Sequence, residues 1–224
     1  MSPWSINDYK KALALLRQRG FMMLFAGKPG QSFYQWARQE IGCGDPEMDF
    51  VATWEMSNLM AEQRDAYYGK LFRDYILIEI GFMPVFLSVY PLGDARELYW
   101  SGNLSRKAWE VFGLLEEGPR TTVALNQATG ARDRKSRAET EKALAELMRA
   151  RVACRAGALR SPVRSWDVAL YDLLARWLPE GIAEEAAALT RDYALERLFE
   201  KFYEATGGRD ENAARRFFRL SKSP

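Results

Sequence analysis

Histidine is absent from this chain of 224 residues, and that absence excludes several kinds of chemistry. Ser-His-Asp triads, Cys-His pairs and histidine-ligated metals all require an imidazole. A catalyst built from this sequence would have to use carboxylates, tyrosine, lysine, glutamine or a bound cofactor. The most familiar hydrolytic arrangements are therefore ruled out by composition.

Cysteine is scarce as well, since the chain contains only Cys43 and Cys154. They form no Cys-x-x-Cys pair, and without histidine they cannot complete a zinc site. We expect both thiols to pack as small apolar groups. We therefore predict no metal site and no cofactor.

Long hydrophobic runs are also missing, because no apolar stretch approaches the roughly 20 residues that span a bilayer. Residues 1–20 do not resemble a signal peptide, since charged side chains recur among the apolar positions and no small-residue cleavage site follows. We therefore expect a cytoplasmic protein with no membrane partner. The length allows one large domain or two small ones.

Charge is distributed unevenly along the chain, although the net charge is only +2. Residues 131–164 contain ten basic and four acidic side chains, a surplus of six, so the remainder of the chain carries −4. Residues 40–65 contain seven acidic side chains and one basic. A basic segment beside an acidic remainder suits a directional contact with phosphate, although solvated helix faces give the same composition.

Residues 103–163 follow the order of a winged helix-turn-helix: helix, turn, helix, turn, basic helix, then two short apolar runs around a glycine. The third helix is expected over residues 136–150, with its basic side chains near the N-terminal half. Hairpin strands are expected at 152–154 and 159–166, with Arg155, Gly157 and Arg160 at the wing. The side chains predicted to contact DNA are Arg132, Arg134, Lys135, Arg137, Lys142, Arg155 and Arg160.

The rest of the chain is mainly helical. Apolar spacing predicts a helix over 5–19, capped by Ser5 and ended by Gly20, and a short buried strand over 21–25 before a turn at 27–30. Residues 71–79 fit either a long helix or a strand that feeds a helix. Helices are also predicted over residues 167–177, 182–189, 192–205 and 211–220. The last of them carries Arg215, Arg216 and Arg219 on one face.

These patterns predict a mainly α chain with small β-hairpins (α+β), built from tandem winged helix-turn-helix modules. The predicted divisions are an N-terminal α/β region over 1–94 that includes a divergent winged helix, a central winged helix over 95–168, and a helix-turn-helix-like region over 169–224.

Several short motifs resemble the winged-helix proteins of the AlkZ/YcaQ-type crosslink-repair DNA glycosylase family. Within the central module they are Gly-Pro-Arg-Thr-Thr at 118–122, Lys-Ser-Arg at 135–137 and Ala-Leu-Ala-Glu-Leu at 143–147. Elsewhere they are Arg-Gly-Phe at 19–21, Gln-Trp-Ala at 35–37, Tyr-Tyr-Gly-Lys-Leu-Phe-Arg at 67–73, Met-Pro at 83–84 and Trp-Asp-Val-Ala-Leu-Tyr at 166–171. The resemblance implies tandem winged-helix modules that cradle DNA.

For active members the resemblance also implies a Gln-x-Gln or Gln-x-Asp pair soon after the first helix. The corresponding residues 20–25 contain no polar side chain that could position a water at a glycosidic bond. We therefore predict a DNA-binding protein, for duplex or damaged DNA, that is related to DNA glycosylases but is not an enzyme.

Two alternatives remain open. A DNA repair glycosylase for alkylated or crosslinked DNA could use other residues, and the candidate carboxylates are Glu55, Glu62, Asp65 and Asp74. A ligand-sensing or protein-interaction scaffold could instead use the region of Trp4, Trp36, Trp54 and Trp100, although aromatic clusters more often form core.

Overall fold

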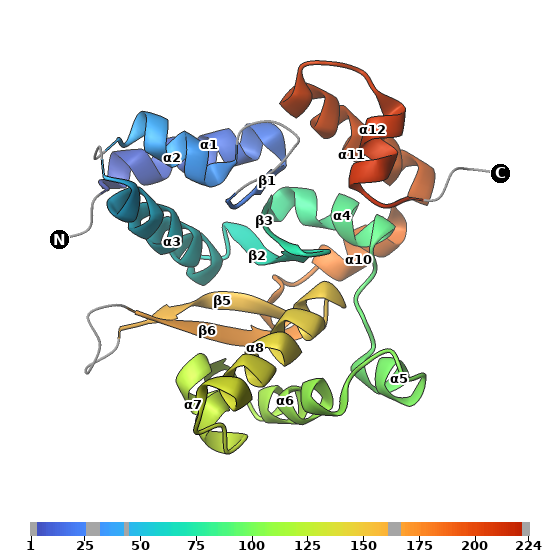
Figure 1. Ribbon diagram of the computed structural model, residues 1–224. Helices are drawn as coiled ribbons and strands as arrows, with labels where there is room; N and C mark the ends of the chain where they lie inside the picture. Colours follow the sequence, from blue (N-terminus) through green and yellow to red (C-terminus); the bar gives the residue numbers. More distant parts are fainter. Residues whose placement is uncertain (1–3, 26–31, 43–44, 161–166, 221–224) are drawn as a thin grey trace. The chain divides into compact units, whose positions relative to one another are not determined.

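A computed structural model describes residues 4–25, 32–42, 45–160 and 167–220 (Figure 1). The chain divides into two compact units. The first unit combines Met1–Trp54, Leu77–Tyr90 and Gly181–Pro224, and the second combines Glu55–Ile76 and Pro91–Glu180. Two elements contribute residues to both units, the helix α3 (Pro46–Glu62) and the strand β3 (Asp74–Glu79).

The prediction of a mainly α chain with a smaller β part is confirmed, since 61% of the described residues are helical and the sheet is small and antiparallel. Twelve α-helices and six strands lie within the described residues. None of the helices in those ranges is both long and apolar enough to cross a membrane. The predicted turn at 27–30, the hairpin residues 161–166 and Cys43 lie outside the described residues.

The first unit opens with the helix that the sequence predicts, α1 (Ile6–Arg19). Its start is a capping box, in which the Ser5 hydroxyl accepts from the Asp8 amide and the Asp8 carboxylate accepts from the Ser5 amide at 2.9 Å. Gly20 ends the helix at φ 74°, a conformation that glycine adopts without strain. The buried strand β1 (Phe21–Met23) follows directly and is the sheet neighbour of β3.

Aromatic side chains form the centre of the first unit. The ring of Phe21 packs against those of Phe82, Phe217 and Phe218, with centroids 5.6–6.5 Å apart. The helix α4 (Met83–Val89) packs on α10 (Ile182–Ala188) and α11 (Arg191–Thr206). The remaining elements of this unit are α2 (Phe33–Glu40), the 3₁₀ turn η1 (Ile80–Phe82) and α12 (Glu211–Phe217).

The second unit contains a helical layer and most of the sheet. Its helices are α5 (Ala95–Trp100), α6 (Arg106–Glu116), α7 (Thr122–Ala128), α8 (Arg134–Arg149) and α9 (Leu174–Trp177). Its strands are β2 (Ala66–Leu71), β4 (Arg120–Thr121), β5 (Ala153–Leu159) and β6 (Val168–Leu173), together with the start of β3. The strand order is β3-β2-β5-β6-β4, and α8 packs on β2 and β5 (Figure 1).

The apolar residues that the sequence places on the first helix of the central module are buried together. Leu104, Ala108, Val111, Phe112 and Leu115 share one core with Leu144, Leu147 and Met148 of α8 and with Ala169 and Tyr171 of β6. Because each helix contributes one apolar stripe, the opposite face of α8 is left to solvent.

Two expectations about local structure are wrong, and a third is confirmed in one of its alternatives. Residues 168–173 form β6 instead of the first half of a helix, because the strand pairs with β4 on one side and β5 on the other. The strand β5 continues to Leu159, so Arg155 and Gly157 lie within it and not in a wing. Residues 74–79 form the strand β3, which leads through η1 into the helix α4, so the predicted alternative of a strand that feeds a helix is confirmed.

Candidate nucleic-acid interface

The basic helix α8 begins with its own capping box. The Asp133 carboxylate accepts from the Ser136 amide at 2.8 Å, and the Ser136 hydroxyl accepts from the Asp133 amide at 3.2 Å. The bond from the Ser136 amide lowers the pKa of the Asp133 carboxyl, so the cap stays ionised at neutral pH. The side chains of Asp133 and Ser136 therefore fix the first turn of the basic helix.

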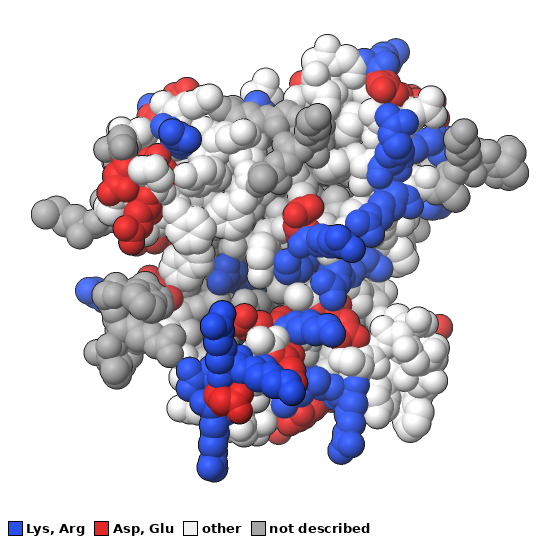
Figure 2. Space-filling model, in the orientation of Figure 1, with Lys and Arg blue, Asp and Glu red and all other residues white. Residues whose placement is uncertain are grey.

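Most of the cations that the sequence predicts to contact DNA are exposed around the start of this helix. Four of them lie within six consecutive residues: Arg132, Arg134, Lys135 and Arg137. Lys142 follows two helical turns after Lys135. Arg160 is exposed at the end of β5. Figure 2 shows Lys and Arg side chains gathered over α7 and α8 of the second unit, with a few acidic side chains between them.

The five cations on or beside α8 form no ion pair within the described part of the chain. Cations on other helices do, and their pairs include Arg96–Glu116, Lys107–Glu110, Arg197–Glu200, Lys201–Glu204 and Arg215–Glu211. The difference is not a lack of nearby acids, because Glu139, Glu141 and Glu146 each stand four residues after a basic residue of α8. The α8 cations are therefore available to an external anion.

Glu146 shows where one of these acids is engaged. Its carboxylate accepts from the Ser105 amide at 2.6 Å and from the Ser105 hydroxyl at 2.7 Å, at the start of α6. It thereby stabilises the N-terminus of a neighbouring helix, where a negative charge is favourable. Lys142, one turn before Glu146, is left exposed.

Arg155 occupies a different environment from the other predicted contact residues. Its side chain is only 9% exposed, and its Nη1 donates to the Tyr68 hydroxyl at 2.7 Å. The guanidinium lies 4.8 Å from the ring centroid of Tyr68 and 5.8 Å from that of Tyr171. Tyr68, Arg155 and Tyr171 are direct partners on β2, β5 and β6, so Arg155 belongs to the interior of the sheet face.

The four candidate carboxylates come from separate places in the second unit. Glu55 lies on α3 and is half-buried, and Glu62 is exposed at the end of that helix. Asp65 is half-buried before β2, whereas Asp74 is exposed at the start of β3. Among the described residues no group of three or more acidic or cysteine side chains could hold a metal ion.

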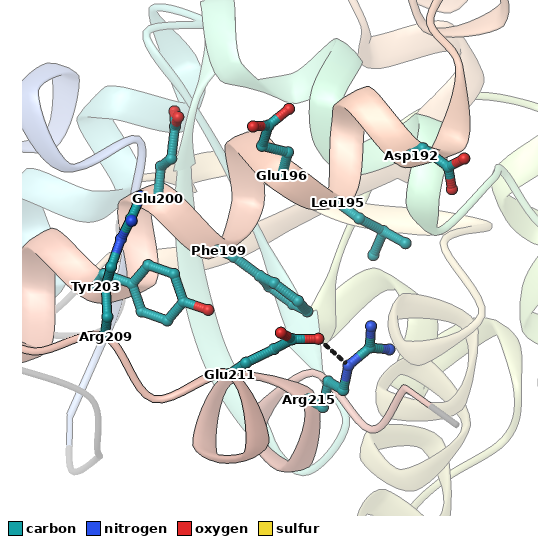
Figure 3. A pocket seen from close by; sticks show the side chains of 9 residues that line it. All are labelled: Asp192, Leu195, Glu196, Phe199, Glu200, Tyr203, Arg209, Glu211 and Arg215. Carbon is teal, nitrogen blue, oxygen red and sulfur yellow. Dashed lines mark hydrogen bonds and ion pairs between the residues drawn. The ribbon is translucent and has the colours of Figure 1, made fainter. Parts of the chain in front are cut away.

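A groove of about 530 Å³ lies between α11 and α12 of the first unit (Figure 3). The Arg215 guanidinium lies 5.6 Å from the ring centroid of Phe199 and pairs with Glu211 at 2.7 Å. The Arg209 guanidinium lies 5.9 Å from the ring centroid of Tyr203. In Figure 3 the carboxylates of Glu196 and Glu200 extend away from Arg215. Both rings of the groove are thus already covered by the chain's own cations.

The tryptophans considered for a sensing scaffold do not line this groove. Trp36 is buried, Trp4 and Trp54 are half-buried, and all three belong to the first unit. Trp100 belongs to the second unit and is 81% exposed, next to a stack formed by Tyr99 and Trp109 with centroids 4.8 Å apart. The structure therefore distributes these four side chains between two units.

Two cations that the sequence analysis passed over lie near the other end of α8. Arg149 is exposed at the last position of the helix, and Lys70 is half-buried on β2. The spacing of Lys135, Lys142 and Arg149, seven residues apart, is a signal that could have indicated Arg149. No pattern along the chain links Lys70 to it.

Comparison with known proteins adds one finding. No curated protein and no solved structure matches the sequence. A family model described as AlkZ related matches residues 6–219.

Proposed function

The chain belongs to the AlkZ-related family, and we propose from that premise that it is a non-catalytic DNA-binding protein whose second unit contains a winged helix. The element order α6, β4, α7, α8, β5, β6 supports this reading, as does the pairing of β4 with β6. In a winged helix-turn-helix the third helix enters the major groove and the hairpin lies along the backbone. Here the third helix is α8.

One observation carries the proposal: the exposed cations around the start of α8 form no ion pair in the described structure, although cations on other helices do. Phosphate contacts need such side chains, because each neutralised phosphate releases condensed counterions into solution. Arg132, Arg134, Lys135, Arg137, Lys142 and Arg160 form the proposed contact set, and Arg155 supports the sheet beneath it.

The absence of catalysis is proposed from the segment that follows α1. Phe21, Met22, Met23 and Leu24 are all buried, and the Gly20 carbonyl accepts from the Glu79 amide at 2.8 Å. A glycosylase needs a polar side chain that positions water or stabilises the sugar beside an extruded base. A buried apolar strand at this place packs the core and offers no such group.

A second DNA-binding module is proposed in the first unit, where α10, α11 and α12 form the C-terminal helices and Arg216 and Arg219 are exposed. The division of the chain into three regions with boundaries at residues 94 and 168 stays a prediction.

The cytoplasmic location of the protein also stays a prediction.

The first experiment measures binding of a fluorescent duplex by anisotropy over a series of salt concentrations. We expect log Kobs to fall with log salt, and the triple variant Arg134→Gln/Lys135→Gln/Arg137→Gln to reduce that slope by about 2.7, at about 0.9 for each lost phosphate contact. The matched control, Arg96→Gln/Lys107→Gln/Arg197→Gln, removes the same charge from paired cations. It should leave the slope nearly unchanged.

Two outcomes would contradict this proposal. One is the absence of binding to intact, alkylated or crosslinked duplex at low salt, and the other is an equal loss in the control variant. The glycosylase alternative is examined with the same damaged duplexes, from which we expect no release of free base. Release that is abolished by replacing Glu55, Glu62, Asp65 or Asp74 would establish that alternative instead.

A further inference from the structure

The solvent face of α8 carries cations along its whole length, and not only at its start. Lys135, Lys142 and Arg149 are exposed and recur every seven residues, a spacing that keeps side chains on nearly one line along a helix. The small residues Ala138 and Ala145 stand on one side of this line, and Glu139 and Glu146 stand on the other, with the Glu146 carboxylate bound to Ser105. The face is therefore a row of three cations with small residues along one side of it and two acids along the other.

The distance between the ends of this row can be compared with the dimensions of DNA. Fourteen residues at 1.5 Å each place Lys135 and Arg149 about 21 Å apart along the helix axis. The major groove of B-form DNA is about 12 Å wide. A helix that enters the groove can therefore reach the phosphates on both of its walls if both of its ends carry cations.

The C-terminal cation of the row has an ordinary explanation that must be weighed first. A basic residue in the last turn of a helix is favoured by the helix dipole, so Arg149 alone would not indicate a ligand. Lys70 makes the difference. It lies on β2, the strand on which α8 packs, and both burial and the charge of Arg149 lower the pKa of its ammonium group. The register that pairs Tyr68 with Arg155 also sets the end of β2, with Lys70, beside the start of β5, which follows the last turn of α8, so both cations lie at the same end of this layer.

The structure fixes Lys70 in this position without an ion pair. Its Nζ donates to the Arg73 carbonyl at 2.9 Å and lies 3.8 Å from the ring centroid of Tyr75. In the described part of the chain, neither Lys70 nor Arg149 pairs with a carboxylate, and only the charge of Asp74 opposes the lowering of the Lys70 pKa. A carbonyl and an aromatic face orient the ammonium group without a carboxylate in contact with it, which suits an external anion.

We propose that Lys70 and Arg149 form a second phosphate-contact point, so that α8 lies across the major groove with Lys135 and Arg149 at phosphates on opposite walls. This inference rests on the proposed function and makes it more specific. It assigns the start of α8 to one strand of the duplex, the C-terminal end with Lys70 to the other, and Ala138, Lys142 and Ala145 to the base edges between them. The β2–β3 hairpin thereby becomes part of the interface.

The test compares Lys70→Gln, Arg149→Gln and the double variant with wild type in the same salt series on an intact duplex. Each single change should reduce the slope of log Kobs against log salt by about 0.9, and the double change by about 1.8. The matched control is Arg96→Gln, which removes one exposed positive charge of the same unit from an ion pair with Glu116. Its slope should equal that of wild type.

Conservative changes separate contact from folding. Lys70→Arg and Arg149→Lys keep the charge and should keep the wild-type slope, and circular dichroism should show folded protein in each case. If Lys70→Gln does not fold, the comparison of Arg149→Gln with Arg149→Lys decides the matter. A smaller salt slope for Arg149→Gln than for Arg149→Lys supports the phosphate contact, and equal slopes for the two variants overturn it.

The outcomes also distinguish the two proposals. If wild type binds and only the variants at the start of α8 reduce the slope, the second contact point is wrong and the DNA-binding function stands. If Lys70→Gln and Arg149→Gln change stability but match Arg96→Gln in slope, these residues have a structural role only and the inference is overturned. If wild type binds no duplex, both proposals fail.

Discussion

Arg155 illustrates how a single side chain can be charged and still belong to the interior. Its guanidinium lies over the rings of Tyr68 and Tyr171, and it donates a hydrogen bond to the Tyr68 hydroxyl. Aromatic faces attract cations through their negative quadrupole, and the attraction strengthens when water is excluded. The residue therefore supports the sheet on which α8 packs.

Gly93 is a second residue whose identity is determined by a neighbour far away in sequence. A Cβ at this position would lie 2.1 Å from the carbonyl oxygen of Ala150, which belongs to the backbone just after α8. A backbone atom cannot rotate away as a side chain can. Any larger residue must therefore displace the end of the basic helix.

We predict that Gly93→Ala lowers the free energy of unfolding by about 1–3 kcal/mol, the usual cost of overpacking. The control is Gly113→Ala in α6, where an added Cβ meets nothing within 4 Å. That change should raise the free energy of unfolding by up to about 1 kcal/mol, because alanine favours helix over glycine. Urea denaturation measures both, and equal effects of the same sign would refute the argument.

At the scale of the element, α6 is held at both ends by side chains from other parts of the second unit. Glu146 of α8 binds its first residues through Ser105. At the other end, Arg176 donates to the carbonyl of Leu115 at 2.6 Å and to that of Glu116 at 3.3 Å, while it also pairs with Asp172. Helix ends need such partners because their last carbonyls have none within the helix.

Two helices end with an arginine in the left-handed conformation that usually belongs to glycine. Arg64 follows α3 at φ 58°, and Arg151 follows α8 at φ 57°. In both cases the next amide bonds back five residues, from Asp65 to Met60 and from Val152 to Leu147. This is the geometry of a Schellman C-cap, in which a side chain is strained.

We predict different results from replacing these two arginines by glycine. Arg64→Gly should stabilise the protein by about 1 kcal/mol, because its exposed side chain is removed together with the strain. Arg151→Gly should give no gain, since its guanidinium donates to the carbonyls of Pro91 and Arg149 at 2.8 Å each. Urea unfolding checks the pair, and a gain at Arg151 equal to that at Arg64 would disprove the role of these two bonds.

At the scale of the whole molecule, the second unit buries three phenols and one thiol that can lose a proton. Burial raises the pKa of the Tyr67, Tyr68 and Tyr75 phenols and of the Cys154 thiol. Each of these groups is neutral when protonated, so the folded chain retains its proton at a pH where the unfolded chain has lost it. Lys70, whose pKa is lowered, acts in the opposite direction.

The sign of the pH dependence follows from this difference. The contribution of these four groups is complete below pH 8, and it decreases once the unfolded thiol ionises near pH 8.5 and the unfolded phenols near pH 10. We predict that the free energy of unfolding falls between pH 8 and pH 11, as measured by urea denaturation. In Cys154→Ala the part of the fall that starts near pH 8.5 should disappear. A free energy that stays level or rises over this range would show that the assignment is wrong.

Local patterns predicted much of the fold wherever the deciding contacts lie within one element. Ser5 and Gly20 mark the ends of α1, and the apolar spacing in α6 and α8 identifies the faces that are buried. The exposed cations at the start of α8 follow from the same periodicity. Capping and amphipathic spacing act over a few residues, so they can be read along the chain.

Other features could not be predicted because they depend on partners distant in sequence. The apolar spacing of residues 168–177 fits a helix, but hydrogen bonds to β4 and β5 make its first half a strand. The burial of Arg155 depends on Tyr68, which is 87 residues away. Pairing across a sheet is a long-range interaction, and periodicity within one segment carries little information about it.

The sequence by itself determined the chemistry that is excluded, the helical character, the basic segment and the family, because composition and short-range pattern are sufficient for these. The tertiary structure alone decided which cations remain available. In the folded chain the Glu146 carboxylate binds the start of α6, Arg155 lies between two tyrosines, and Lys70 lies on the strand against which the helix of Arg149 packs. These outcomes depend on which side chains meet when α8 packs on the sheet, and that packing is a property of the folded chain.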